Sequence, residues 1–149
     1  MSIMFSRQCE YALQAVMYLA LKPQDEMTSI KELTQKLDTP YHFLGKILQN
    51  LTHKGLLKSL KGPSGGFALA LPSEDINLLQ IIEAIDGASF TKGCVLGFPE
   101  CSKSDPCALH DQWVPSRDSI IAMLKGKSVA EMANKMKKPQ YLMNKRSSG

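Results

Sequence analysis

Residues 29–55 are SIKELTQKLDTPYHFLGKILQNLTHKG, and they contain two short helical patterns separated by a tight break. In the first pattern, Ser29 and Glu32 have the spacing of a capping box, in which each side chain binds the backbone N–H of the other residue. Apolar residues then recur every three or four positions up to Leu37, which predicts one buried helical face. We therefore expect a short helix that begins after Ser29.

The second pattern starts at Thr39, the expected N-cap, with Pro40 in the first helical position. Its apolar residues from Phe43 to Leu51 form a single stripe, and Gly55 marks its end. Two helices joined by so short a turn predict a helix-turn-helix.

Strand-like segments follow this helix pair at residues 56–60 and 67–71. They flank the loop KGPSGG, residues 61–66, whose glycines and proline are typical of a hairpin tip. A hairpin directly after a helix-turn-helix predicts a wing.

Helical patterns also stand on either side of this unit. One runs from Phe5 to Leu21 and stops before Pro23. The other opens with Asn77 and Gln80, which have capping-box spacing, and ends at Gly87. The predicted fold class is therefore mainly α with a small β-hairpin wing.

The chain has 149 residues, of which 44% are hydrophobic and 21% are charged. This length suits one globular domain with an accessory element. The apolar runs fall far short of the about 20 residues that a membrane span needs, and the N-terminus lacks the apolar stretch of a secretory signal. We expect a cytoplasmic protein with no membrane partner.

Positive charge is concentrated in two zones. Residues 31–61 hold six lysines and two acids, and the tail from Asn134 holds five cations and no acid. A charge run is more often a solvated face than a binding site, but on a winged helix it also suits DNA. Residues near the start of the second helix can read base edges, and the wing can contact phosphate. The predicted DNA contacts are Thr28, Ser29, Tyr41, His42, Lys46, Lys61, Gly62 and Ser64.

A loop rich in Gly, Ser, Pro and Cys follows Gly87, and it contains Cys94, Cys101 and Cys107. Asp105 and Pro106 predict a helix start that places Cys107 in the first turn and His110 one turn later. Three thiolates and an imidazole suit a zinc ion or an iron–sulfur cluster. Zinc sites usually contain a close pair of cysteines, which this loop lacks, so the spacing favours the cluster, with unliganded redox thiols as a further alternative.

The segments SRQCEYALQAVMYLA, FLGKILQNLTHKGLLKSLKGPSGGFALA and IIEAIDG, followed by three cysteines, resemble the winged-helix iron–sulfur regulators of the IscR and NsrR type, in the Rrf-two superfamily. The resemblance covers roughly residues 3–125. It implies a homodimeric repressor that binds double-stranded DNA at a partly palindromic operator. It also implies that the long helix after Cys107 mediates dimerisation, and that Cys94, Cys101 and Cys107 hold a cluster, with [2Fe-2S] favoured over [4Fe-4S].

The resemblance leaves the fourth cluster ligand open. His110 stands where IscR-like proteins have a histidine ligand, whereas NsrR-like proteins use an acid that corresponds to Glu10 of a partner subunit. The remaining alternative is Cys9 or an exchangeable ligand. The sequence departs from the IscR pattern in having one more residue between Cys94 and Cys101, and two further features concern other positions. Gly45 replaces an acidic residue that IscR-like proteins use in operator discrimination, and Pro115 implies a kink or a late start of the dimerisation helix.

The expected organisation is a DNA-binding domain at 1–75, the cluster loop and dimerisation helices at 76–133, and a basic tail at 134–149. We expect the protein not to be an enzyme. Other hypotheses are a zinc- or thiol-based regulator of the same fold, a cysteine-dependent oxidoreductase, and a winged helix that binds only protein. The absence of a Cys-x-x-Cys pair disfavours the oxidoreductase, and the basic zone of residues 31–61 disfavours the last.

Overall fold

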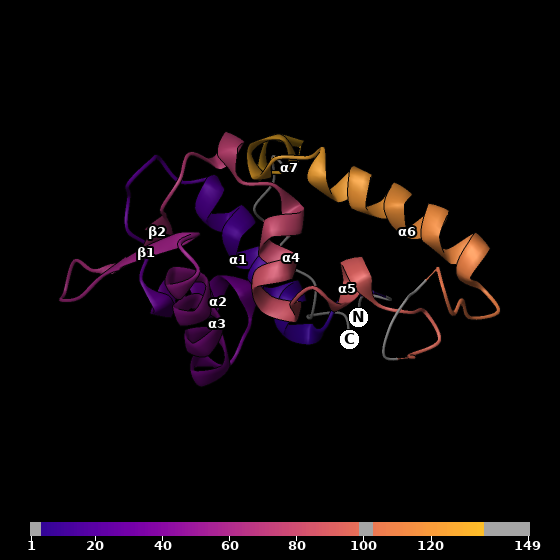
Figure 1. Cartoon of the computed structure of the whole chain (residues 1–149). Helices are drawn as coiled ribbons and strands as arrows, with labels where there is room; N and C mark the ends of the chain where they lie inside the picture. Colours follow the sequence, from indigo (N-terminus) through magenta and orange to yellow (C-terminus); the bar gives the residue numbers. More distant parts are fainter. Residues whose placement is uncertain (1–3, 99–102, 136–149) are drawn as a thin grey trace.

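The computed structural model describes residues 4–98 and 103–135. Within these ranges the chain is mainly helical with one two-stranded antiparallel hairpin, which confirms the predicted fold class. The elements are α1 (Arg7–Ala20), α2 (Ile30–Leu37), α3 (Tyr41–His53), β1 (Leu57–Leu60), β2 (Gly66–Leu69), the 3-10 turn η1 (Ser73–Asp75), α4 (Leu78–Asp86), α5 (Ser89–Lys92), α6 (His110–Lys125) and α7 (Val129–Lys135). The hairpin and α6 project from opposite sides of a helical body (Figure 1). None of the helices in the described ranges is long and apolar enough to cross a membrane.

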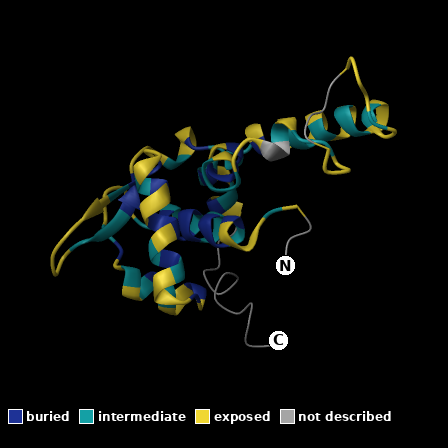
Figure 2. Ribbon diagram, turned by 60° about the horizontal axis from the view of Figure 1, so that its bottom comes forward, coloured by how far each residue is buried: buried dark blue, intermediate teal, exposed yellow. Residues whose placement is uncertain are grey.

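The core surrounds α1, which contacts α2, α3, α4, α7 and β2. Its small residues Ala12 and Ala15 are fully buried, and small side chains allow the surrounding helices to approach closely. The apolar stripes of α2 and α3 face the same core, where Leu33 and Leu44 are also fully buried. Figure 2 shows this burial in the body and much less of it along α6. The helix-turn-helix is therefore held by α1 as well as by its own turn.

The start of α2 forms only half of the expected capping box. The Ser29 hydroxyl accepts a hydrogen bond from the Glu32 backbone N–H at 3.1 Å, as predicted. The Glu32 carboxylate instead accepts a hydrogen bond from the Tyr18 hydroxyl at 2.7 Å and pairs with Lys22 at 2.8 Å. The carboxylate thus links α2 to α1, because these tertiary partners compete with the local bond of a capping box.

The predicted start of α3 was wrong by one residue. Pro40 is the N-cap and Tyr41 the first helical residue. Thr39 is buried, and its hydroxyl donates to the Leu37 carbonyl at 3.1 Å instead of capping α3. Asp38 takes the left-handed conformation at φ 50°, so the turn is closed by residues 38 and 39 together.

The wing is the hairpin of β1 and β2, in which Leu57 pairs with Leu69 and Leu60 with Gly66. Thr28 forms an isolated β-bridge with Phe67 of β2, since its N–H donates to the Phe67 carbonyl at 2.9 Å and its carbonyl accepts from the Phe67 N–H at 2.8 Å. This pairing attaches the base of the wing to the segment that leads into α2. The sequence analysis did not predict it.

The pairing with Thr28 requires a glycine at position 66. Gly66 has φ +151°, and a Cβ there would lie 2.2 Å from the Thr28 carbonyl oxygen.

Gly62 is the matched control for a substitution at Gly66, because it also has positive φ (+105°) but no atom within 4 Å of an added Cβ. We expect Gly62→Ala to lower the free energy of unfolding by about 1 kcal/mol through backbone strain alone. Gly66→Ala should cost about 1–3 kcal/mol more through overpacking. Urea titration followed by circular dichroism would measure both, and equal losses would contradict the close approach.

The long helix α6 begins later than the sequence predicted. It starts at His110 with Leu109 as N-cap, whereas Asp105 and Pro106 were expected to open it and to place Cys107 in its first turn. Residues 103–109 form bends and turns instead, and Cys107 there contacts the cysteine loop through its sulfur. The late start agrees with one of the two outcomes that Pro115 implied, and Pro115 itself lies inside the helix.

After α6 the chain returns to the body. The Val129 N–H donates to the Ile76 carbonyl at 2.7 Å, and Val129 is fully buried in the main core. Asn77 and Gln80 form the complete capping box that was predicted for α4. The helix α7 continues to Lys135 and so includes the first two residues of the expected basic tail, and the rest of that tail lies outside the described residues.

Candidate functional site

The solvent face of α3 carries three of the eight predicted DNA contacts. Tyr41, His42 and Lys46 are all exposed, and Tyr41 has 56% of its surface accessible. The rings of Tyr41 and His42 meet edge to face with centroids 5.7 Å apart. The opposite face of the helix is buried through Leu44 and Leu48. The N-terminal turn of α3 is therefore free to approach another molecule.

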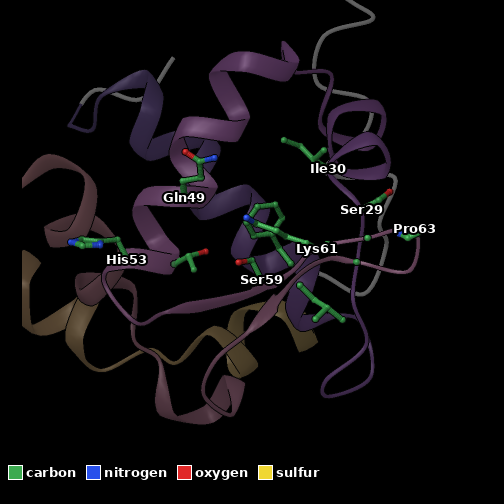
Figure 3. Close-up of a pocket in the computed structure, with 13 residues that line it drawn as sticks. Ser29, Ile30, Gln49, His53, Ser59, Lys61 and Pro63 are labelled. Atoms are coloured by element: carbon green, nitrogen blue, oxygen red, sulfur yellow. The ribbon is translucent and has the colours of Figure 1, made fainter.

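A groove of about 550 Å³ separates the C-terminal half of α3 from the wing. Gln49 and His53 of α3 line one side, and Ser59 and Lys61 of the wing line the other (Figure 3). Ser29, at the start of α2, also lines it. Donors from two elements thus face one channel, which is an arrangement suited to a strand of phosphates.

A smaller groove of about 300 Å³ continues along α3 toward its N-terminus. It is lined by Tyr41, His42 and Lys46, and it shares Gln49 with the larger groove. Gly45 also lines it, and an added Cβ there would lie 3.4 Å from Ile30, in ordinary contact. The glycine therefore keeps this part of the surface open.

The remaining predicted DNA contacts divide into two groups. Gly62 and Ser64 are exposed at the wing tip, beside Lys61. Thr28 is only 1% exposed, because its backbone pairs with Phe67 inside the structure. The Thr28 side chain is therefore too buried to be a DNA contact. Gln49 and His53 were not in the predicted set, although their positions off the apolar stripe of α3 could have indicated them.

The second part of the site is the loop after α5. The sulfur atoms of Cys94 and Cys107 lie 3.6 Å apart, although thirteen residues separate them in the chain. Both cysteines are partly exposed and not joined by a disulfide. Two thiolates on one tetrahedral metal ion, at about 2.3 Å from it, are about 3.8 Å apart. This sulfur pair therefore fits two ligands of a single metal atom.

The groups around Cys94 favour its thiolate form over its thiol form. Its pKa lies below the ordinary value, chiefly because the Leu96 backbone N–H donates to the sulfur at 3.4 Å. The N–H groups of Phe98 and Gly97 and the thiol of Cys107 lower the pKa further, whereas burial opposes them. Since metals bind thiolates rather than thiols, this turn suits ligation.

Trp113 connects the cysteine loop to α6. Its indole N–H donates to the Gly93 carbonyl at 3.1 Å, next to Cys94. This bond ties the first turn of α6 to the residue before Cys94. Through this hydrogen bond, a change in the conformation of the loop can affect the position of α6.

The other predicted ligands are Cys101, His110 and Glu10. Cys101 lies outside the described residues. His110 is the first residue of α6 and Glu10 lies in the first turn of α1, both partly exposed. Among residues 4–98 and 103–135, no group of three or more His, Cys, Asp or Glu side chains could hold a metal ion.

The fourth cysteine of the chain, Cys9, is in a different environment. It is fully buried against Leu79, Ile82 and Leu124 of α4 and α6. Burial raises its pKa to about 12, with further contributions from the carboxylates of Asp86 and Glu10. Cys9 is therefore a neutral core residue that joins α1 to α4 and α6.

A helix-turn-helix with a wing and an open recognition-helix surface defines the winged-helix class of transcriptional regulators. Comparison with known families agrees, since the model of the Rrf2 family, described as an iron-dependent transcriptional regulator, matches residues 5–135. The chain belongs to the Rrf2 family and is a transcriptional regulator.

Individual relatives support this assignment. A protein of Aquifex aeolicus (strain VF5), classed with the HTH-type transcriptional regulators, is 33% identical over 134 residues, which are 89% of this chain and 92% of the relative. The regulator IscR of Photorhabdus laumondii is 27% identical over 83% of this chain and 75% of its own. The solved structure of CymR, the global cysteine regulator of Bacillus subtilis, superimposes with a TM-score of 0.75 at 24% identity and covers 89% of this chain and 98% of its own. This last likeness shows the fold.

Proposed function

We propose that the protein is a cytoplasmic, homodimeric repressor whose affinity for a partly palindromic operator is controlled by an iron–sulfur cluster. The observation that carries the proposal is the sulfur pair of Cys94 and Cys107, 3.6 Å apart on a chain that also exposes a recognition helix and a wing. The family description as iron-dependent regulators supports iron as the metal. The protein acts by binding DNA and not as an enzyme.

In this proposal Cys94, Cys101 and Cys107 hold the cluster, with His110 as the fourth ligand or Glu10 of a partner subunit in its place. Each iron of a [2Fe-2S] cluster takes two protein ligands, whereas each iron of a [4Fe-4S] cluster takes one. The short distance between the sulfurs of Cys94 and Cys107 therefore favours [2Fe-2S]. When bound, the cluster would supply a centre that responds to redox state, to nitric oxide or to cluster supply.

Dimerisation through α6 is supported by its exposure. Within α6, all of which the structure describes, Leu124 is the one buried residue. Met123 is 54% exposed, and Ile120 and Ile121 are partly exposed. A helix that projects from the body with apolar residues uncovered is a candidate for pairing with a second copy (Figure 1).

The proposed coupling between cluster and DNA is mechanical. A change at Cys94 reaches α6 through the bond between Gly93 and Trp113. The other end of α6 packs through Leu124 against Cys9 and Ile82, and so against α1 and α4 of the body. A shift of α6 in a dimer would change the separation of the two recognition helices, which must match the spacing of the operator half-sites.

The direct test is anaerobic purification followed by absorption spectroscopy, metal and sulfide analysis, and operator binding. The proposal expects brown protein that contains iron and acid-labile sulfide, with DNA affinity that changes when the cluster is removed. Colourless protein with stoichiometric zinc would favour the alternative of a zinc-based regulator, which the same sulfur pair also fits. Protein with neither metal would favour a thiol-based regulator.

The fourth ligand can be assigned by a pair of substitutions. We expect His110→Ala to shift the absorption spectrum and to make the cluster labile, because a neutral imidazole completes the ligand set without adding charge. Glu10→Gln should leave the spectrum unchanged. Anaerobic spectra and the rate of bleaching in air would measure both variants. The reverse pattern would assign the role to Glu10 and would indicate a cluster shared between subunits.

A further inference from the structure

We propose that Cys94 and Cys107 form an intrachain disulfide in the cluster-free protein, which makes the pair a thiol redox site with a low-molecular-weight disulfide as the oxidant. This inference deepens the regulation of the proposed cluster site, although the disulfide itself requires no metal. It rests on the geometry of the two side chains.

The two sulfurs are already close to bonding distance. A disulfide bond is about 2.05 Å long, so the sulfurs must approach by about 1.5 Å from their separation of 3.6 Å. Cys94 lies just after α5, and Cys107 lies in the segment before α6. Neither residue is held in a helix or strand, so side-chain rotation and a small backbone shift can close the gap.

The pair is also accessible, unlike the remaining described cysteine. Cys94 and Cys107 are partly exposed, so a small disulfide can reach them. The Leu96 N–H donates to the Cys94 sulfur at 3.4 Å, so this sulfur is oriented while it lies beside that of Cys107. Cys9 is fully buried among apolar side chains and serves as an internal control.

The reaction balances with oxidised glutathione as the oxidant. The Cys94 thiolate attacks one sulfur of glutathione disulfide and forms a mixed disulfide, while one glutathione thiolate leaves. The Cys107 thiolate then attacks the Cys94 sulfur and displaces the second glutathione. Two protein thiols are oxidised by two electrons, and two molecules of glutathione are formed with the two protons.

The consequence is that oxidation would block cluster insertion. Both sulfurs of the disulfide are removed from the ligand set, so a cluster cannot use them until a reductant restores the thiols. Oxidised, cluster-free protein should therefore take up no cluster from iron and sulfide until it has first been treated with dithiothreitol. The two states of the pair, ligand and disulfide, exclude each other.

Peptide mapping tests the connectivity. Cluster-free full-length protein would be incubated with oxidised glutathione, alkylated and digested with trypsin. Cleavage after Lys92, Lys103 and Arg117 puts Cys94 and Cys101 in peptide 93–103 and Cys107 in peptide 104–117. We expect these two peptides to be joined, and Cys9 to remain a thiol. The variant Cys101→Ser removes the ambiguity within peptide 93–103 and should keep the link, whereas Cys107→Ser should lose it.

Several results would overturn the inference. A bond inside peptide 93–103 would assign the disulfide to Cys94 and Cys101, and loss of the link in Cys101→Ser would assign it to Cys101 and Cys107. A dimer on a non-reducing gel that disappears on reduction would indicate a bond between subunits, and stable glutathione adducts would show that the pair does not close. All these outcomes are independent of whether reduced protein binds a cluster, so failure here is distinguishable from failure of the proposed function.

Discussion

Replacing Cys107 with serine is expected to give a protein that folds but retains no stable iron–sulfur cluster. The substitution removes one of two sulfurs that lie 3.6 Å apart, and a serine hydroxyl is a poor replacement for a thiolate toward iron. Cys94→Ser should have the same effect. Iron and sulfide content after anaerobic reconstitution would measure the loss, and circular dichroism would check that the helices remain. Full iron content in either variant would contradict the assignment of both ligands.

Cys9→Ala is the matched control for this experiment. Cys9 is fully buried against Leu79, Ile82 and Leu124, away from solvent and from the cysteine loop. We expect this variant to keep the cluster and to lose about 1 kcal/mol of stability through the small cavity that it creates. Loss of the cluster from Cys9→Ala would indicate that packing between α1 and α6 controls the cluster site.

Replacing Lys46 with alanine should weaken binding to the cognate operator by about 1–3 kcal/mol and relax the preference at particular base pairs. Lys46 is exposed on α3 and lines the smaller groove beside Tyr41 and His42, where a recognition helix faces base edges.

Lys61 lines the larger groove from the wing, so Lys61→Ala should weaken cognate and unrelated duplexes by similar factors. It should also lower the slope of the salt dependence by about one per subunit, since one fewer counterion is released.

Fluorescence anisotropy on cognate and unrelated duplexes across a salt series would separate the two effects. Lys125→Ala is the matched control, because Lys125 is an exposed lysine at the end of α6 and lies in neither groove. The helix α6 and the wing project from opposite sides of the body (Figure 1). It should change neither affinity nor preference beyond the small effect of net charge. If Lys46→Ala and Lys61→Ala bound every duplex as the unmodified protein does, a winged helix that binds only protein would become the better interpretation.

The helix-turn-helix and the wing could be predicted because their signals are local. A capping residue, an apolar stripe and a terminal glycine act within a few positions of one another, and α2, α3 and the hairpin lie where these signals put them to within a residue or two. The local signals failed where a tertiary partner competed. Thr39 closes the turn instead of capping α3, and Glu32 binds Tyr18 and Lys22 instead of completing its capping box.

The start of α6 is the largest such failure. Asp105 and Pro106 are good local signals for a helix start, yet the helix begins at His110. The contact between the sulfurs of Cys94 and Cys107 involves residues thirteen positions apart, and no local pattern encodes it. The same holds for the β-bridge between Thr28 and Phe67 and for the hydrogen bond between Val129 and Ile76.

By itself, the sequence determined that this protein has a winged helix-turn-helix with a basic recognition region and a separate cysteine-rich loop, because helix periodicity, capping and glycine turns are properties of neighbouring residues. Packing between distant elements sets the different environments of the three described cysteines. Cys94 and Cys107 meet at the loop, while Cys9 is enclosed by three helices and becomes part of the core. The reason is that thiol chemistry depends on burial and on the distance between sulfurs, and both are set by packing between elements remote in the chain.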